Sequence, residues 1–172
     1  MIYDYVALYK KNAAFYNTHP RAKRLLKVGN LFLTLLFAAS YVGLWAYTLC
    51  LAPLEIKEMV MMLFVPLLTL VTVSVLRMAV ERPRPYAENG AGIVPLVDKK
   101  KSDNRSFPSR HLACAAAIAM TFLPFYPLAG GFLLICSILL GYTRFALGVH
   151  YPSDLFAGMS IGMLLGGFMF IL

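Results

Sequence analysis

Two histidines and an aspartate stand at spacings that can support nucleophilic catalysis. His150 and Asp154 are four residues apart, and Pro152 between them suits the start of a helix. At that spacing the Asp154 carboxylate can reach one ring nitrogen of His150 and fix its tautomer, which leaves the other nitrogen as a nucleophile or base. A second histidine, His111, lies in the sequence Pro-Ser-Arg-His. It can donate the proton that a departing oxygen needs.

Positively charged groups near the ends of apolar segments complement these residues: Arg77, Arg84 and Arg144. Guanidinium groups stay protonated and can fork onto phosphate oxygens, so they can stabilise a phosphoryl group under attack. Ser109 stands at the expected N-cap of a helix, whose free N–H groups favour an anion. The residue set therefore predicts attack on a phosphoryl group. Three members have alternative explanations. Arg77 can extend from an apolar helix to water, Arg84, like its neighbour Arg82, can be a basic flank of the apolar segment, and Ser109 can be a cap only.

The acidic residues and cysteines favour chemistry without a metal ion or cofactor. Asp154 is the only acid in the set, and Glu81 and Glu88 are isolated, whereas protein magnesium sites are built on carboxylates. The cysteines lie in apolar runs without Cys-x-x-Cys spacing, which predicts small buried side chains rather than a disulfide or a metal site: Cys50, Cys114 and Cys136.

The elements that must position these residues are strongly apolar. Of 172 residues, 60% are hydrophobic and 14% charged, which predicts one integral membrane domain. Five stretches are long enough, or nearly so, to cross a hydrocarbon core of about 30 Å, and each must be helical because backbone groups cannot go unpaired in lipid. The predicted spans are Leu31–Ala52, Met59–Val80, Ser109–Tyr126, Leu128–Thr143 and Leu155–Leu172. The predicted fold is an all-α integral membrane protein.

Residues 1–27 are predicted to form an amphipathic, basic segment at the membrane surface, followed by a catalytic domain over residues 28–172. The apolar residues of this segment recur at steps of three and four: Ile2, Val6, Tyr9, Ala13 and Tyr16. The segment lacks the features of a cleaved signal sequence, so we expect it to be retained.

Five crossings would bring the chemically suited residues to one face of the membrane. The second and fourth spans end on this face, and the third and fifth spans begin on it. The converging residues are Arg77, Arg84, Ser109, His111, Arg144, His150 and Asp154. In the last span, glycines at steps of four predict close helix packing within the monomer, and a contact between two chains is possible but not favoured: Gly158, Gly162 and Gly166.

The order and spacing of these residues resemble the type 2 phosphatidic acid phosphatase family over roughly residues 60–172. The family pattern is Lys-x6-Arg-Pro, then Pro-Ser-Gly-His, then Ser-Arg-x5-His-x3-Asp. The matching blocks here are Arg77-x6-Arg84-Pro85, Pro108-Ser109-Arg110-His111 and Thr143-Arg144-x5-His150-x3-Asp154.

The resemblance implies a role for each matching residue. His150 would form a phosphohistidine, Asp154 would support it, and His111 would be the general acid. The phosphate would be held by Arg77, Arg84, Arg144, Ser109 and the backbone amide of Arg110.

Three positions depart from the family pattern. Arg77 replaces lysine and Thr143 replaces serine, so the charge and the hydroxyl are kept. Arg110 replaces glycine, which keeps the N–H but puts a bulky cation beside the phosphate. That cation would favour a doubly charged head group such as a diphosphate.

These observations predict a metal-independent phosphatase acting on a phosphomonoester or diphosphate of a membrane lipid. The family implies phosphatidic acid, phosphatidylglycerophosphate or undecaprenyl diphosphate as candidates. The alternatives are a phosphotransferase using the same phosphohistidine, and a non-catalytic lipid-binding or transport protein. The net charge of +8 does not favour nucleic acid as a partner, because the basic residues flank apolar runs.

The expected location is a bacterial-type cytoplasmic membrane, which the chain crosses several times. Of the 16 lysines and arginines, all but Lys57 fall on the face of the predicted site. The positive-inside rule therefore favours the cytoplasmic side for the site. The resemblance points to the outer side, where most bacterial members of the family act.

Overall fold

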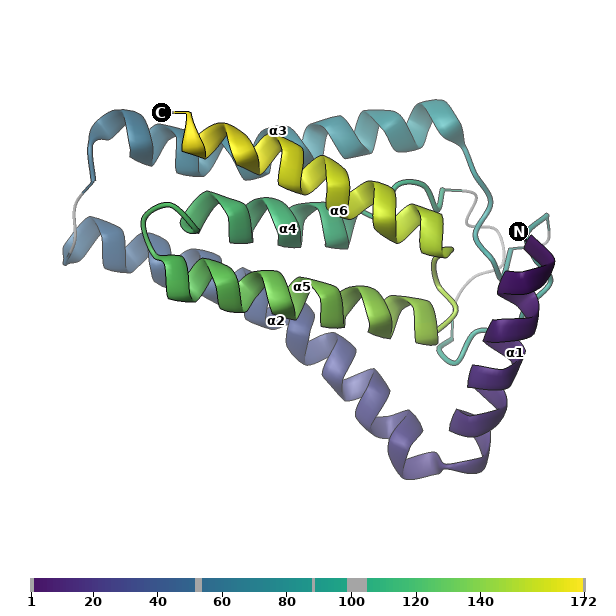
Figure 1. Cartoon of the computed structure of the whole chain (residues 1–172). Helices are drawn as coiled ribbons and strands as arrows, with labels where there is room; N and C mark the ends of the chain where they lie inside the picture. Colours follow the sequence, from purple (N-terminus) through teal and green to yellow (C-terminus); the bar gives the residue numbers. More distant parts are fainter. Residues whose placement is uncertain (1, 52–53, 88, 99–104, 172) are drawn as a thin grey trace.

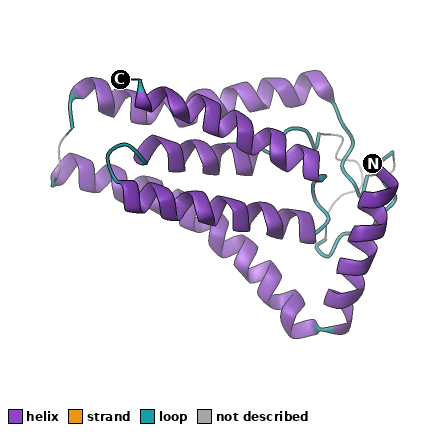
Figure 2. Cartoon of the chain, viewed as in Figure 1, coloured by secondary structure: helices purple, strands orange, loops and turns teal. Residues whose placement is uncertain are grey.

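The computed structural model describes the chain except residues 1, 52–53, 88, 99–104 and 172. Within the described residues there are helices and loops and no strand (Figure 2). In chain order the helices are α1 (Ile2–Thr18), α2 (Pro20–Cys50), α3 (Ile56–Val80), α4 (Arg110–Phe122), α5 (Pro127–Ala146), α6 (Pro152–Gly167) and the short 3-10 helix η1 (Phe168–Phe170) (Figure 1). The predicted boundaries at Ala52 and Leu172, and the isolated Glu88, lie outside the described residues.

Within the described residues, four helical segments are long and apolar enough to cross a membrane: α2, α3, α5, and α6 continued by η1. Proline is the first residue of α2, α5 and α6, where its missing N–H leaves no hydrogen bond unmade. At the start of α3, the N–H of Glu55 donates to the Glu58 carboxylate at 2.9 Å, as part of a capping box. The prediction of an all-α, multi-pass membrane protein is confirmed.

The helix α4 is shorter than its predicted span and lies at the centre of the bundle. It has 13 residues, about 20 Å of helix, and it packs against α3, α5 and α6. Its small side chains Ala113, Ala116 and Ala117 are fully buried. The helix ends at Phe122, two residues before Pro124, because a proline has no N–H to continue the helical hydrogen bonds.

Three glycines of α6, Gly158, Gly162 and Gly166, face α4 of the same chain. A methyl group at Gly158 would lie 2.6 Å from the carbonyl oxygen of Ser109, and one at Gly162 would overlap the Ala113 carbonyl. Gly166 meets the side chain of Met120 in the same way. The absence of side chains on this face lets α6 approach α4 closely, so that Ser109 and Asp154 lie side by side.

The helix α2 begins at Pro20, eleven residues before the predicted span, because the basic residues that follow it are good helix formers. At 31 residues, or about 46 Å, it exceeds the thickness of the hydrocarbon core. Its first half diverges from α5, and α1 returns across the end of the bundle where α3 ends and α4 and α6 begin (Figure 1).

The predicted apolar stripe of α1 packs against the protein. Of the stripe, Tyr9 is buried, and Val6, Ala13 and Tyr16 are partly buried against the same cluster, which also contains the buried Tyr5 from outside the stripe. The side chain of Ile2 lies outside the described part of the chain. The placement of α1 relative to the membrane surface stays a prediction.

Candidate active site

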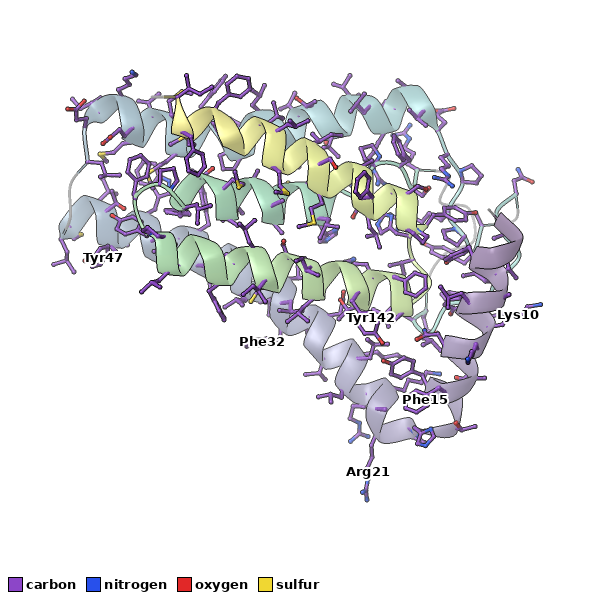
Figure 3. All side chains as sticks on the ribbon, in the orientation of Figure 1. Lys10, Phe15, Arg21, Phe32, Tyr47 and Tyr142 are labelled. Atoms are coloured by element: carbon purple, nitrogen blue, oxygen red, sulfur yellow. The ribbon has the colours of Figure 1, made fainter. Side chains whose placement is uncertain are left out.

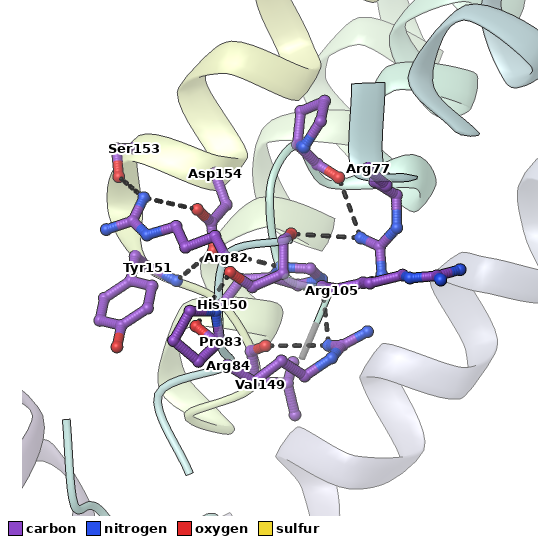
Figure 4. Close-up of polar contacts among 12 residues, drawn as sticks. Arg77, Arg82, Pro83, Arg84, Arg105, Val149, His150, Tyr151, Ser153 and Asp154 are labelled. Atoms are coloured by element: carbon purple, nitrogen blue, oxygen red, sulfur yellow. Dashed lines mark hydrogen bonds and ion pairs between the residues drawn. The ribbon is translucent and has the colours of Figure 1, made fainter. Parts of the chain in front are cut away.

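His150 lies in the short loop between α5 and α6, and Asp154 lies in the first turn of α6 (Figure 4). The exposed fractions of their side chains are 2% and 0%. His150 Nδ1 is 3.5 Å from Asp154 Oδ2, and His150 Nε2 is 3.5 Å from Nη1 of Arg84. One ring nitrogen therefore faces a carboxylate and the other faces a guanidinium group.

The environment of His150 keeps its ring neutral. Burial, helped by the charges of Arg84 and Arg144 and opposed by Asp154, lowers the pKa of His150 to about 4. At neutral pH the ring therefore carries one proton. If that proton is on Nδ1, facing Asp154, the lone pair of Nε2 is available for attack.

The loop that carries His150 is shaped by a glycine and by backbone hydrogen bonds. Gly148 has φ of +74°, a conformation that L residues with a side chain rarely adopt. The N–H of Val149 donates to the Arg144 carbonyl at 3.2 Å, and the Val149 carbonyl accepts from Arg84 Nη1 at 3.0 Å. These contacts turn the chain sharply after α5 and tie His150 to the segment that follows α3.

Arg82 is a site residue that the sequence did not identify. Its Nη1 donates to Asp154 Oδ1 at 2.8 Å and to Ser153 Oγ at 2.7 Å, and its guanidinium group lies 4.1 Å from the centroid of the Tyr151 ring. The other carboxylate oxygen of Asp154 accepts from the Tyr151 N–H at 2.9 Å. In the sequence, Arg82 beside the motif residue Arg84 is equally explained as a basic flank of the apolar segment, and no signal distinguishes that explanation from a role in the site.

Arg77 is buried, with an exposed fraction of 5%, and does not extend to water. Its guanidinium group donates to the carbonyls of Ser106 at 3.2 Å and Pro108 at 3.0 Å, and also to the carbonyl of Arg105. The residue predicted to hold phosphate thus holds the loop that leads into α4. That loop ends at Ser109, the residue just before α4.

Ser109 occupies the N-cap position of α4, but its side chain makes no capping hydrogen bond. Its N–H donates to the Asp154 carbonyl at 2.9 Å. The hydroxyl is fully buried and has no hydrogen-bond partner in the described part of the chain. A buried hydroxyl without a partner costs about 1–3 kcal/mol, which a bound anion would offset.

The remaining predicted residues lie around this centre. Arg110 and His111 are exposed in the first turn of α4, and His111 lies within electrostatic range of Arg144 and His150. Arg144, in the last turn of α5, donates to Thr34 Oγ1 of α2 at 3.2 Å. The helix α2 thus contributes a polar contact to the site, which the motifs did not indicate.

A cavity of about 270 Å³ adjoins the histidine centre. It is lined by Ser74, Arg77, Met78, Arg84, Arg105 and Arg110. Four of these side chains are guanidinium groups and none is acidic, so the cavity suits an anion. Arg84 lines it and also approaches His150 Nε2. Across the described residues, no cluster of three histidine, cysteine or acidic side chains could hold a metal ion.

Comparisons with known proteins agree with this fold and these motifs. A lipid A 1-phosphatase from Rhizobium johnstonii is 33% identical over 90 residues, which are 52% of this chain and 37% of that protein. The chain spans less than half the length of the curated relatives it matches.

Two solved structures share the fold. Aquifex aeolicus LpxE has a TM-score of 0.62 and 23% identity, with 87% of this chain and 94% of that chain covered. A transmembrane PAP2 type phosphatidylglycerolphosphate phosphatase from Bacillus subtilis has a TM-score of 0.57 and 21% identity, with 98% and 93% covered.

The family comparison covers the part of the chain that carries the site. The model of the PAP2 superfamily matches residues 58–172, well over half of the chain and all three motif blocks. The resemblance drawn from the motifs is confirmed, and the chain belongs to the PAP2 superfamily.

Proposed function

We propose that this protein is a metal-independent phosphatase of membrane lipids that works through a phosphohistidine at His150. The observation that carries the proposal is the buried His150–Asp154 pair, with Nε2 of the neutral ring directed at Arg84. Membership of the PAP2 superfamily and the similarity to a protein named lipid A 1-phosphatase support it.

The first step is attack of His150 Nε2 on the phosphorus of the lipid. A nitrogen–phosphorus bond forms and the bond from phosphorus to the leaving oxygen breaks, while Nδ1–H is held by Asp154. His111 donates a proton to the departing oxygen. Negative charge on the equatorial oxygens is stabilised by Arg84, Arg144, the Ser109 hydroxyl and the N–H groups at the start of α4.

The second step is hydrolysis of the phosphohistidine. A water molecule gives a proton to His111, attacks phosphorus and displaces His150, which releases inorganic phosphate. An alcohol in place of water would make the enzyme a phosphotransferase. Released phosphate and label transferred to an added alcohol distinguish the two reactions.

We further propose that the substrate head group carries a second negative charge, as a lipid diphosphate does. Arg110, where the family has glycine, and Arg105 line the cavity beside Arg84. An anionic group next to the attacked phosphate would fit there. Undecaprenyl diphosphate is of this kind, whereas phosphatidic acid and phosphatidylglycerophosphate carry a single terminal phosphate ester.

A phosphate-release panel over lipid mono- and diphosphates, with EDTA present, tests both proposals. We expect turnover with EDTA and a preference for a diphosphate. Changing Arg110 to glycine should lower diphosphate turnover and spare monophosphate turnover. An unchanged ratio would remove the argument from Arg110, and loss of all turnover with EDTA would refute a metal-independent reaction. His150→Ala should abolish turnover.

A further inference from the structure

The helix α1 lies outside residues 58–172, which match the family model. It packs along the end of α5 and the loop that carries His150. Figure 3 shows Tyr142 of α5 on the side that faces α1, and Lys10 pointing away from the bundle. Successive turns of α1 meet successive positions of α5 and the loop after it, in the pairs Tyr16 with Tyr142, Asn12 with Ala146, Tyr9 with Gly148, and Tyr5 with Tyr151. His150 lies between the last two of these contacts.

Two of the contacts hold the end of α5. The hydroxyl groups of Tyr16 and Tyr142 are 3.2 Å apart. Asn12 Nδ2 donates to the Ala146 carbonyl at 3.0 Å. Carbonyl groups in the last turn of a helix lack intrahelical partners, so Asn12 satisfies one of them where the chain leaves α5.

Tyr9 ties two loops together behind the histidine. Its side chain is only 2% exposed, and its hydroxyl donates to the Val94 carbonyl at 2.8 Å. Its ring lies so close to Gly148 that a methyl group there would be 2.7 Å from the ring carbons. The Leu96 N–H donates to the Leu147 carbonyl at 3.1 Å, which joins the same two loops.

Tyr5 connects α1 to Asp154 through Tyr151 and Arg82. Its ring centroid is 5.1 Å from that of Tyr151, which in turn is 4.1 Å from the guanidinium group of Arg82. Arg82 and the Tyr151 N–H each hold one oxygen of Asp154. A continuous series of contacts therefore joins α1 to the His150–Asp154 pair.

We propose that α1 is a positioning element that holds the loop 147–151 so that His150 Nε2 points at the phosphorus. The proposal rests on the proposed function. Tyr5, Tyr9 and Asn12 act through the loop rather than on the substrate. A displacement of about 1 Å in a reacting group can cost on the order of a hundredfold in rate, so loss of these contacts lowers kcat.

The test compares three variants of the full-length protein in the same detergent: Tyr9→Leu, Tyr9→Phe and Lys11→Ala. Lys11 lies on the exposed side of α1 and is the matched control. For Tyr9→Leu we expect kcat to fall ten- to a hundredfold with KM changed less than threefold. Tyr9→Phe keeps the ring and loses one hydrogen bond of about 1 kcal/mol, so its kcat falls about fivefold. Lys11→Ala should match the wild type.

Two outcomes overturn the proposal. One is a wild-type kcat in Tyr9→Leu. The other is a Tyr9→Leu defect seen only in KM. If Tyr9→Leu fails to fold, Tyr9→Phe decides by the same split between kcat and KM.

A second readout does not depend on activity. Hydrogen exchange in the peptide containing residues 147–151 should be faster in the Tyr9 variants than in Lys11→Ala. If no lipid phosphate is turned over by the wild type, the proposed function fails, while the exchange result still decides whether α1 holds the loop.

Discussion

Replacing Arg82 with alanine tests whether this residue holds Asp154 in place for His150. The change removes the 2.8 Å ion pair to Asp154 and the stacking on Tyr151. Asp154 is fully buried and keeps the Tyr151 N–H and the 3.5 Å contact with His150 Nδ1. Its carboxylate would then be free to rotate away from the ring.

The size of the effect follows from the exposure of the pair. Hydrogen bonds to charged groups contribute about 1.5–3 kcal/mol, whereas exposed ion pairs contribute about 0–1 kcal/mol. The Arg82 side chain is 30% exposed and that of Asp154 is 0% exposed, so a value near the lower end, about 2 kcal/mol, is expected. Because about 1.4 kcal/mol corresponds to a factor of ten, kcat/KM should fall about thirtyfold.

The assay is phosphate release by Arg82→Ala, Asp154→Asn and the double variant, on the lipid that the panel identifies. Arg21→Ala is the matched control, because Arg21 points away from the protein at the start of α2 (Figure 3). Asp154→Asn should lose more activity than Arg82→Ala, since it removes the partner of Nδ1 itself. The double variant should be within about threefold of Asp154→Asn, because coupled residues are not additive.

Two results would refute this reasoning. A wild-type kcat/KM in Arg82→Ala would show that the ion pair does not matter for catalysis. A further thirtyfold loss in the double variant relative to Asp154→Asn would show that Arg82 acts on the substrate rather than through Asp154.

Three further predictions concern packing, pH and orientation. Gly158→Ala should cost about 1–3 kcal/mol and lower Tm, because its methyl group would lie 2.6 Å from the Ser109 carbonyl; Gly167→Ala, with open space around it, should not. Since the pKa of His150 is about 4 when folded and 6.5 ordinarily, the unfolded chain binds an extra proton between these values. Wild-type Tm should therefore fall faster than that of His150→Gln as pH drops from 6.5 toward 4; parallel curves would contradict the buried, neutral ring. If the site faces the cytoplasm, Asp98→Cys, in a variant without the native cysteines, should resist an impermeant maleimide in intact cells; labelling there would place the site outside.

Much of the fold followed from the sequence because its signals are local. Apolar length predicted α2, α3, α5 and α6, and the parity of the crossings predicted that distant motif residues meet at one end of the bundle. The length of α4 did not follow, because the residues after Phe122 are as apolar as those before it. The N-terminal end of α2 was also predicted wrongly, because the helix begins at Pro20 and continues through the basic residues that follow it.

The amphipathic stripe of α1 shows a second limit. Periodicity identified Tyr9, Ala13 and Tyr16 as one face of a helix, and the same face is buried in the structure. An apolar face can be covered by lipid or by protein, and its sequence does not distinguish them. The loops that cover it here come from residues more than 70 positions later in the chain.

The sequence by itself determined the class of the protein, its family and the residue types that its candidate site contains. Composition predicted membrane helices. The spacings of His150–Asp154, Pro108–His111 and Arg77–Arg84 identified the family, because such short spacings can be read from the sequence without knowing how the helices pack. Only the tertiary structure decided how the side chains are used. Arg82 reaches Asp154 across 72 residues, Arg77 binds carbonyl groups, and the Ser109 hydroxyl has no hydrogen-bond partner among the residues that the structure describes. These outcomes depend on how α4, α6 and the loop after α3 pack together, and the number of residues between two positions does not specify that packing.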